Sequence, residues 1–277
     1  MVYLRLIRPL NCTLAAVGVL VASVVAVGTR VSEQSYLLPV LLACIAAALI
    51  TAAGNVLNDY SDRDTDKVNH PERPIPSGQV SPANALAYSG ILFVIPLPLS
   101  YFINIETFLV VVLNVLVLVS YERRFKRRGL PGNLEVSWLT GSIFIFGGLA
   151  AYKGDFSLFS RTMYLALLAF FATLGREIAK DIQDVWGDVD RRTLPRRMGV
   201  RSAAQVSAIC FILAVLFSFV PPFLGILSPY YILVVVVADI IFIYCTTLLI
   251  GRPRKASNVA KIGMIVALFA FLLGGFL

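Results

Sequence analysis

Residues 37–66 read LLPVLLACIAAALITAAGNVLNDYSDRDTD, an apolar run that ends in a cluster of acidic side chains. Residues 37–57 contain no charged side chain, and a helix needs about 20 mostly apolar residues to cross a bilayer. The acids begin where the apolar run stops. This stretch therefore predicts a membrane-spanning helix with an acidic site at one face of the membrane.

The composition of the whole chain agrees with a bilayer as its solvent. The 277 residues are 58% hydrophobic and 14% charged, with a mean hydropathy of +0.82. A soluble domain is about 25% charged, so this chain has too few polar residues to cover a water-exposed surface. We expect one transmembrane domain over residues 1–277.

Nine segments are apolar and long enough to span the membrane, which predicts an all-α polytopic protein. They are 9–29, 37–57, 84–103, 107–121, 132–152, 162–179, 203–223, 230–250 and 259–277. The segment 84–103 contains Pro96 and Pro98, so we expect a kink there.

The basic residues predict the orientation of the chain. With nine spans, 21 of the 24 Lys and Arg residues fall on one side, and Arg30, Lys153 and Arg161 fall on the other. Because cytoplasmic loops collect Lys and Arg, we expect a cytoplasmic N-terminus and acidic site and an external C-terminus. These basic residues lie between spans and not on a soluble module, so we expect no nucleic-acid partner.

Two acidic clusters follow the second and sixth predicted spans, both on the basic side. If the second helix continues through the first cluster, Asn58, Asp62 and Asp66 recur every four residues along one helical face. In the second cluster, Glu177, Asp181, Asp184 and Asp188 follow a 4, 3, 4 pattern, which also defines one face. Asp64 and Asp190 fall off these faces and are interpreted as solvated residues.

Carboxylates at this spacing repel one another, so two such faces at one end of a bundle predict a bound cation. Oxygen ligands without His or Cys suit magnesium, manganese or calcium. The four cysteines are far apart and His70 is the single histidine, so neither zinc nor a disulfide framework is indicated. Mg²⁺ commonly shares its ligand shell with substrate phosphate, and nearby Lys and Arg favour a diphosphate. The clusters predict metal-assisted loss of a diphosphate leaving group, with Mg²⁺ as the metal and Mn²⁺ as the second choice.

At these residues the sequence resembles the UbiA superfamily of intramembrane prenyltransferases. The family motif NDxxDxxxD is matched by Asn58, Asp59, Asp62 and Asp66, and RPIPSG follows at 73–78. Asp181, Asp184 and Asp188 match the second aspartate motif. The opening RPLN at 8–11 and the central YERRFK at 121–126 are also similar to the family. Within it, AGNVLNDY at 53–60 and REIAKDIQD at 176–184 look like the archaeal enzymes that make digeranylgeranylglyceryl phosphate.

The resemblance implies an isoprenyl diphosphate donor in a hydrophobic tunnel within the bilayer, and a lipid-like phosphorylated acceptor. It implies a metal held by Asn58, Asp62, Asp66, Asp181, Asp184 and Asp188. Asp62, Asp66, Asp181, Asp184 and Lys180 are the implied catalytic residues. The implied substrate-binding residues are Arg8, Asn11, Asn55, Asp59, Tyr121, Lys126 and Arg176. Arg73, Arg191 and Arg192 are available for the phosphate of the acceptor.

Three other interpretations remain open at this point. An aromatic acceptor, as in quinone or tetrapyrrole prenylation, would keep the chemistry and change the product. A cation-coupled transporter would place acids inside the spans, whereas these acids gather at the span ends. Phosphatase chemistry on a lipid diphosphate would use the same metal site. Asp239 alone lies mid-span, and we expect it to hydrogen-bond a neighbouring helix.

Overall fold

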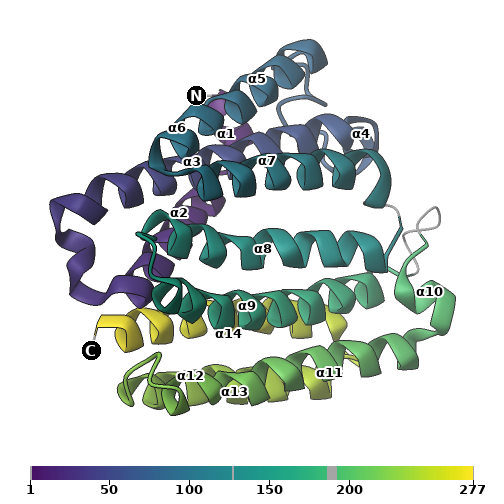
Figure 1. Cartoon of the computed structure of the whole chain (residues 1–277). Coiled ribbons are helices and arrows are strands. Elements are labelled where there is room, and N and C mark those ends of the chain that lie inside the picture. Colours follow the sequence, from purple (N-terminus) through teal and green to yellow (C-terminus); the bar gives the residue numbers. More distant parts are fainter. Residues whose placement is uncertain (1, 127, 186–191, 277) are drawn as a thin grey trace.

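The computed structural model describes residues 2–126, 128–185 and 192–276, and these residues form helices and connecting turns without a strand (Figure 1). The helices are α1 Val2–Ile7, α2 Pro9–Val27, η1 Gly28–Ser32, α3 Gln34–Ser61, α4 Arg63–Asn69, α5 Pro82–Val94, α6 Pro96–Ile103, α7 Ile105–Ser120, η2 Tyr121–Phe125, α8 Leu130–Ala150, α9 Phe156–Gln183, α10 Leu194–Met198, α11 Val200–Ser218, α12 Val220–Phe223, α13 Tyr230–Leu248 and α14 Pro253–Phe276. The prediction of an all-α membrane protein is confirmed.

Each of the nine predicted spans corresponds to helix in the structure. Within the described residues, eight helical segments are long and apolar enough to cross a membrane. The predicted span that is not among these eight is the fifth, 132–152, which is α8; this helix has 21 residues and carries polar side chains such as Asn133, Glu135 and Ser142. The helices make the chain a multi-pass membrane protein.

The predicted kink in segment 84–103 is confirmed. Helix α5 ends at Val94 and α6 begins at Pro96, with Ile95 between them. Proline has no N–H to donate, and its ring clashes with the preceding turn, so the helix is interrupted at this point. Together α5 and α6 form one bent segment that is long and apolar enough to cross the membrane.

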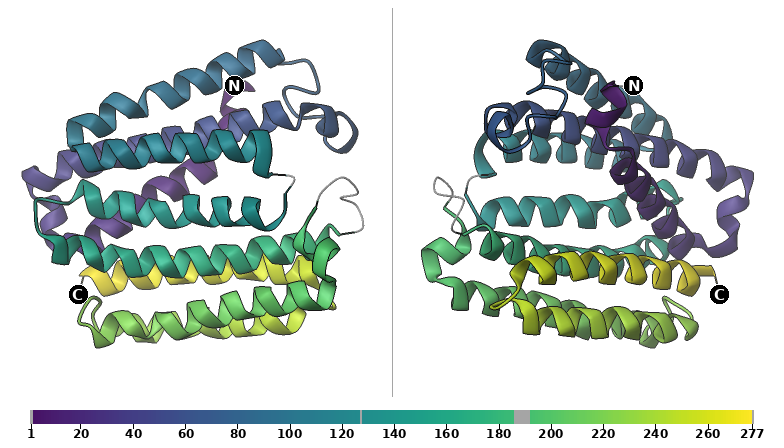
Figure 2. Two further views of the ribbon diagram at one scale, coloured as in Figure 1. Left: turned by 45° about the vertical axis from the view of Figure 1, so that its right-hand side comes forward. Right: turned by 180° about the vertical axis from the view of Figure 1, so that it is seen from behind.

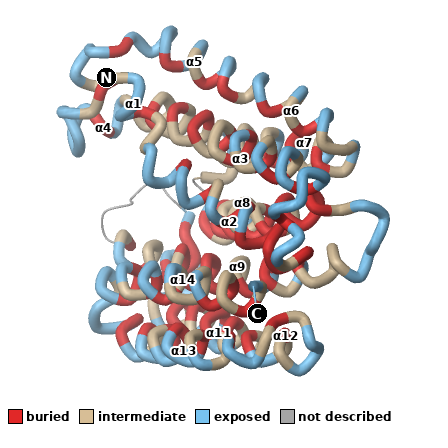
Figure 3. Tube along the Cα trace, turned by 90° about the vertical axis from the view of Figure 1, so that its left-hand side faces the viewer, coloured by how far each residue is buried: buried red, intermediate tan, exposed pale blue. Residues whose placement is uncertain are grey.

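Helix α8 packs against both α2 and α9, and glycines allow the close approach; α8 and α9 lie side by side (Figure 2). A Cβ atom on Gly147 would lie 2.4 Å from the Val19 carbonyl oxygen of α2, and one on Gly141 would lie 2.8 Å from the Ala166 carbonyl oxygen of α9. Small residues let backbones pack closely where lipid supplies no hydrophobic drive between helices. Buried residues gather on the facing sides of these helices (Figure 3).

Buried hydrogen bonds also join the helices. The Ser23 hydroxyl of α2 lies 2.9 Å from the Gly147 carbonyl oxygen of α8. Asn114 of α7 donates to the Ser142 hydroxyl of α8 and accepts from the Trp138 indole. Such bonds contribute roughly 0.6 kcal/mol each in a membrane, so they set the register of the helices more than their total stability.

The acidic segments lie at one end of the bundle. Helices α3 and α9 both end where α4 and α10 are found, and the C-terminus lies at the opposite end (Figure 1). The two polar clusters are therefore at the same end of the molecule although more than a hundred residues separate them in the sequence.

Candidate active site

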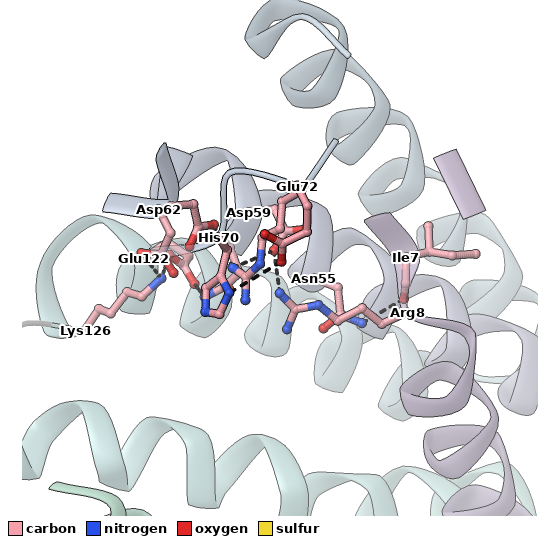
Figure 4. Close-up of polar contacts among 12 residues, drawn as sticks. Ile7, Arg8, Asn55, Asp59, Asp62, His70, Glu72, Glu122 and Lys126 are labelled. Atoms are coloured by element: carbon pink, nitrogen blue, oxygen red, sulfur yellow. Dashed lines mark hydrogen bonds and ion pairs between the residues drawn. The ribbon is translucent and has the colours of Figure 1, made fainter. Parts of the chain in front are cut away.

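The first acidic cluster does not continue as one helix, so the prediction of a single face through Asp66 is wrong. Helix α3 ends at Ser61, Asp62 has φ −87° and ψ 0°, and α4 begins at Arg63. The four polar side chains of this segment have two different sets of partners. Asp59 and Asp66 face arginines, whereas Asn58 and Asp62 face the segment that follows α7. Figure 4 shows Asp59 near Arg8, and Asp62 beside Glu122 and Lys126.

Two arginines neutralise Asp59 and Asp66, which are each 4% exposed. Arg8, between α1 and α2, pairs with Asp59. The Arg73 guanidinium lies 2.6 Å from Asp66 Oδ2 and 3.8 Å from Asp59 Oδ1. Buried charges are tolerated when they are paired, and these pairs fix α4 and the loop after it to the end of α3.

Arg8 has the left-handed backbone conformation, with φ +52°. A non-glycine residue with positive φ is uncommon, and the Pro9 that follows restricts Arg8 further. Asn55 holds the same turn, because its amide donates to the Ile7 carbonyl oxygen at 2.8 Å. Of the predicted substrate-binding residues, Arg8, Asn55 and Asp59 thus meet at this turn, while Asn11 is exposed one turn further along α2.

Asn58 and Asp62 belong to a second network centred on Glu122. The Asn58 amide nitrogen donates to Glu122 Oε1 at 2.9 Å. Lys126 Nζ lies 2.9 Å from Glu122 Oε2 and 2.8 Å from Asp62 Oδ1. The Asp62 side chain is 28% exposed and that of Glu122 is 5% exposed, so Asp62 is the more accessible carboxylate. A cavity of about 190 Å³ opens beside them and is lined by Ser61, Asp62, Glu122, Arg123, Arg124 and Lys126.

A π-helical turn places Lys126 in this network. The turn spans Tyr121–Phe125, and the Lys126 N–H donates to the Tyr121 carbonyl oxygen at 2.9 Å. Such wide turns are rare and often occur at functional sites. A Cβ atom on Gly132 would lie 2.6 Å from the Phe125 carbonyl oxygen, so the start of α8 packs closely against this turn.

The second cluster lies on the last two turns of α9. Glu177 is buried and pairs with both neighbouring cations: Arg176 at 2.6 Å and Lys180 at 2.8 Å. Asp181 accepts a hydrogen bond from Asn133 of α8 at 2.7 Å. Asp184 follows the last residue of the helix and is half-buried like Asp181. Asp188, Asp190 and Arg191 lie outside the described residues.

The donor set suits a hard divalent cation, because Asn58, Asp62, Asp181 and Asp184 offer carboxylate or amide oxygens at one end of the bundle. Among residues 2–126, 128–185 and 192–276, no three His, Cys, Asp or Glu side chains form a metal-holding group by themselves. The structure places the predicted residues of both segments at this end of the bundle, where each segment has its own network of contacts.

Two residues of the site were not predicted from the sequence, Glu122 and Asn133. Glu122 lies four residues before Lys126, a spacing at which opposite charges pair along a helix. That spacing predicts the pair of Glu122 and Lys126. It does not predict that Asn58 and Asp62 also contact this pair. The contact of Asn133 could not be inferred from spacing, because its partner Asp181 is on another helix.

Two predictions about residues away from the site are confirmed. Asp239 of α13 accepts a hydrogen bond from Ser218 of the neighbouring α11 at 2.8 Å. Asp64 is exposed, and the Lys67 ammonium, which donates to it at 2.9 Å, lowers the pKa of its carboxyl. Neither residue contacts the networks around Asn58.

Residues 15–273 match the UbiA prenyltransferase family, so the protein belongs to this family of prenyltransferases. The resemblance seen in the sequence is therefore confirmed over nearly the whole chain.

Individual members of the family are similar to this chain over nearly its whole length. The chain is 40% identical to the digeranylgeranylglyceryl phosphate synthase of Methanothrix thermoacetophila, over 99% of both chains. A solved structure of a digeranylgeranylglyceryl phosphate synthase is 33% identical, with a TM-score of 0.85 over 99% of this chain and 98% of the other. A UbiA homologue from Archaeoglobus fulgidus, solved with DMAPP and Mg²⁺, shares the fold at 16% identity, with a TM-score of 0.62 over 99% of this chain and 98% of its own.

Proposed function

We propose that the protein transfers a geranylgeranyl group from its diphosphate to the hydroxyl of geranylgeranylglyceryl phosphate, in the synthesis of archaeal ether lipids. The observation that carries this proposal is the pairing of two acidic segments, both flanked by cations, at one end of an apolar bundle. Full-length identity to synthases named for this product supports the choice of acceptor.

The residues of the site fit a divalent metal, and magnesium is the proposed one. Asn58 and Asp62 would hold it from the first segment, and Asp181 and Asp184 from the second. Bound there, Mg²⁺ would stabilise the charge that develops on the leaving diphosphate. Asp188, which lies outside the described residues, completes the proposed ligands. Asp66 is engaged with Arg73, and we propose that it supports the site through that arginine.

The cations of the site bind and orient the diphosphate. Lys126, Arg176 and Lys180 are each held by a carboxylate, so their ammonium and guanidinium groups are positioned before substrate arrives. Preorganised cations stabilise a developing negative charge without reorganising during the reaction. Arg8 and Tyr121 are proposed to contact substrate at the rim of the site, with Asn11 next to Arg8.

The reaction exchanges one carbon–oxygen bond for another. The bond between C1 of the geranylgeranyl group and the diphosphate breaks, and the acceptor hydroxyl oxygen bonds to C1. The hydroxyl proton leaves, and diphosphate carries away the electron pair. The reactive carbon must be shielded from water, and the bilayer-embedded helices provide a water-poor environment.

The site is proposed to face the cytoplasm, with the C-terminus outside. The distribution of 21 of 24 basic residues on one side supports this orientation. The phosphorylated acceptor and the diphosphate donor would then both be reached from the cytoplasmic leaflet.

Product formation tests the proposal. Detergent-purified protein is incubated with geranylgeranyl diphosphate and either geranylgeranylglyceryl phosphate or 4-hydroxybenzoate, with and without Mg²⁺, and products are identified by mass. A Mg²⁺-dependent digeranylgeranyl ether is the expected result. If product forms only with the aromatic acid, the proposed acceptor is wrong. If phosphate is released without transfer of the geranylgeranyl group, the proposed transferase reaction is wrong.

A further inference from the structure

The side-chain amide of Asn58 has a defined orientation in this site. Its nitrogen donates to Glu122 Oε1 at 2.9 Å, so the nitrogen is directed at Glu122 and the carbonyl oxygen at the opposite side of the amide. A metal binds an amide through its oxygen and not through its nitrogen. The hydrogen bond to Glu122 therefore selects the amide orientation that leaves the oxygen available as a ligand.

This geometry explains why residue 58 is an amide beside so many acids. An aspartate at position 58 would place a second carboxylate at hydrogen-bond distance from Glu122, and two carboxylates that close repel strongly. An amide, by contrast, donates to Glu122 on one side and presents an oxygen on the other. Asn58 and Glu122 thus have complementary chemistry although 64 residues separate them.

The second oxygen of Glu122 has a separate task. Its Oε2 lies 2.9 Å from Lys126 Nζ, and the Glu122 side chain is 5% exposed, so this ion pair is shielded from solvent. Lys126 also reaches Asp62 at 2.8 Å. Glu122 therefore holds the lysine beside Asp62 even when Asp62 is engaged elsewhere.

We propose that Glu122 is a positioning residue of the prenyl-transfer site, which orients Asn58 as a metal ligand with one oxygen and tethers Lys126 with the other. The proposal rests on the proposed function for its role in catalysis, while its effect on metal binding can be measured without turnover. Glu122 acts through Asn58 and Lys126 and does not itself need to touch substrate.

The substitution Glu122→Gln creates a conflict that a second substitution resolves. The introduced glutamine has one oxygen and one NH₂ group, whereas Glu122 offers two oxygens. If the glutamine oxygen accepts from Asn58, the glutamine NH₂ group is directed at the Lys126 ammonium, and two donors face each other. If the glutamine oxygen accepts from Lys126, the glutamine NH₂ group is directed at Asn58, and the Asn58 amide must flip to present its oxygen. When Asn58→Asp is added, the glutamine NH₂ group donates to the new carboxylate and the glutamine oxygen accepts from Lys126. Both hydrogen bonds are then restored with the same net charge, and Lys126 faces a neutral oxygen in place of a carboxylate.

The test is a double-mutant cycle of Glu122→Gln, Asn58→Asp and the combined variant, in detergent-purified full-length protein. Glu135→Gln is the matched control, because Glu135 is a half-buried carboxylate on α8 that hydrogen-bonds Ser120 and lies outside the proposed site. Two quantities are measured: Mn²⁺ affinity by electron paramagnetic resonance of the free ion, and kcat/KM for ether formation.

Each single variant is expected to lose about tenfold or more in Mn²⁺ affinity and in kcat/KM, a size typical of coupled neighbours. The double variant is expected to recover most of both losses, and Glu135→Gln to match wild type. Additive losses in the double variant would overturn the proposal. If Asn58→Asp does not fold, unchanged Mn²⁺ affinity in Glu122→Gln alone would overturn it. Failure of wild type to make ether would count against the proposed function, while the Mn²⁺ titration would still decide the role of Glu122.

Discussion

Substitution of Arg73 by alanine tests whether the buried acids of the first cluster depend on their arginines. Arg73 is the partner of Asp66, 2.6 Å away, whereas Asp59 keeps Arg8 when Arg73 is removed. Breaking a buried pair leaves an uncompensated charge, which costs about 3–5 kcal/mol. The Arg73 side chain is 30% exposed, so we expect the lower end, roughly 3 kcal/mol.

At about 2–4 °C per kcal/mol for a chain of this size, Arg73→Ala should lower the Tm in detergent by roughly 6–12 °C. The assay is intrinsic-fluorescence thermal unfolding. Lys67→Ala is the control, because Lys67 pairs with the exposed Asp64 on the same helix α4. Water already solvates both partners of that pair, so no measurable shift is expected. An equal Tm for Arg73→Ala and Lys67→Ala would refute the idea that Arg73 neutralises a buried acid.

Three further predictions concern the π-helical turn, the mid-membrane acid and the metal. Gly132→Ala should lower kcat/KM by about an order of magnitude or more, because the added Cβ would collide with the Phe125 carbonyl oxygen. Gly90→Ala is the control and should leave kcat/KM unchanged, because nothing lies within 4 Å of a Cβ there; equal activities of the two variants would contradict the close packing at Gly132. Asp239→Asn should keep the hydrogen bond with Ser218 and leave both Tm and kcat unchanged, whereas Asp239→Leu should lower the Tm without changing kcat. A loss of kcat in Asp239→Asn would show that this acid has a catalytic role. Chelation by EDTA should abolish ether formation and added Mg²⁺ should restore it; activity that persists in EDTA would remove the metal from the reaction.

The positions of the spans could be predicted from the sequence because they depend on local properties. A run of about 20 apolar residues must form a helix in lipid, since its backbone groups find no other partners there. Pro96 interrupts its helix because the missing N–H is a property of the residue itself. The predicted span 132–152 is present as α8, but the sequence does not explain its polar residues. Their partners lie on neighbouring helices, as Asn114 shows by its hydrogen bond to Ser142.

The acidic segments were also recognisable in the sequence, as was the chemistry that their side chains favour. The spacing of four residues between Asn58, Asp62 and Asp66 predicts one helical face, but this prediction assumes that the helix continues. In the structure α3 ends at Ser61 and α4 begins at Arg63, and Asp66 pairs with Arg73 whereas Asn58 and Asp62 contact Glu122 and Lys126. A spacing rule holds only within one regular element, and the partners that interrupt the element are not encoded in the spacing.

The sequence by itself determined the class of protein, its spans and the two segments that carry the acidic side chains. The tertiary structure alone decided which partners each of these side chains has. Asp59 and Asp66 are neutralised by Arg8 and Arg73, while Asn58 and Asp62 join Glu122 and Lys126. The physical reason is that the state of a buried charge depends on what surrounds it. Here those surroundings include Arg8 and Glu122, which lie 51 and 64 residues away along the chain from Asp59 and Asn58.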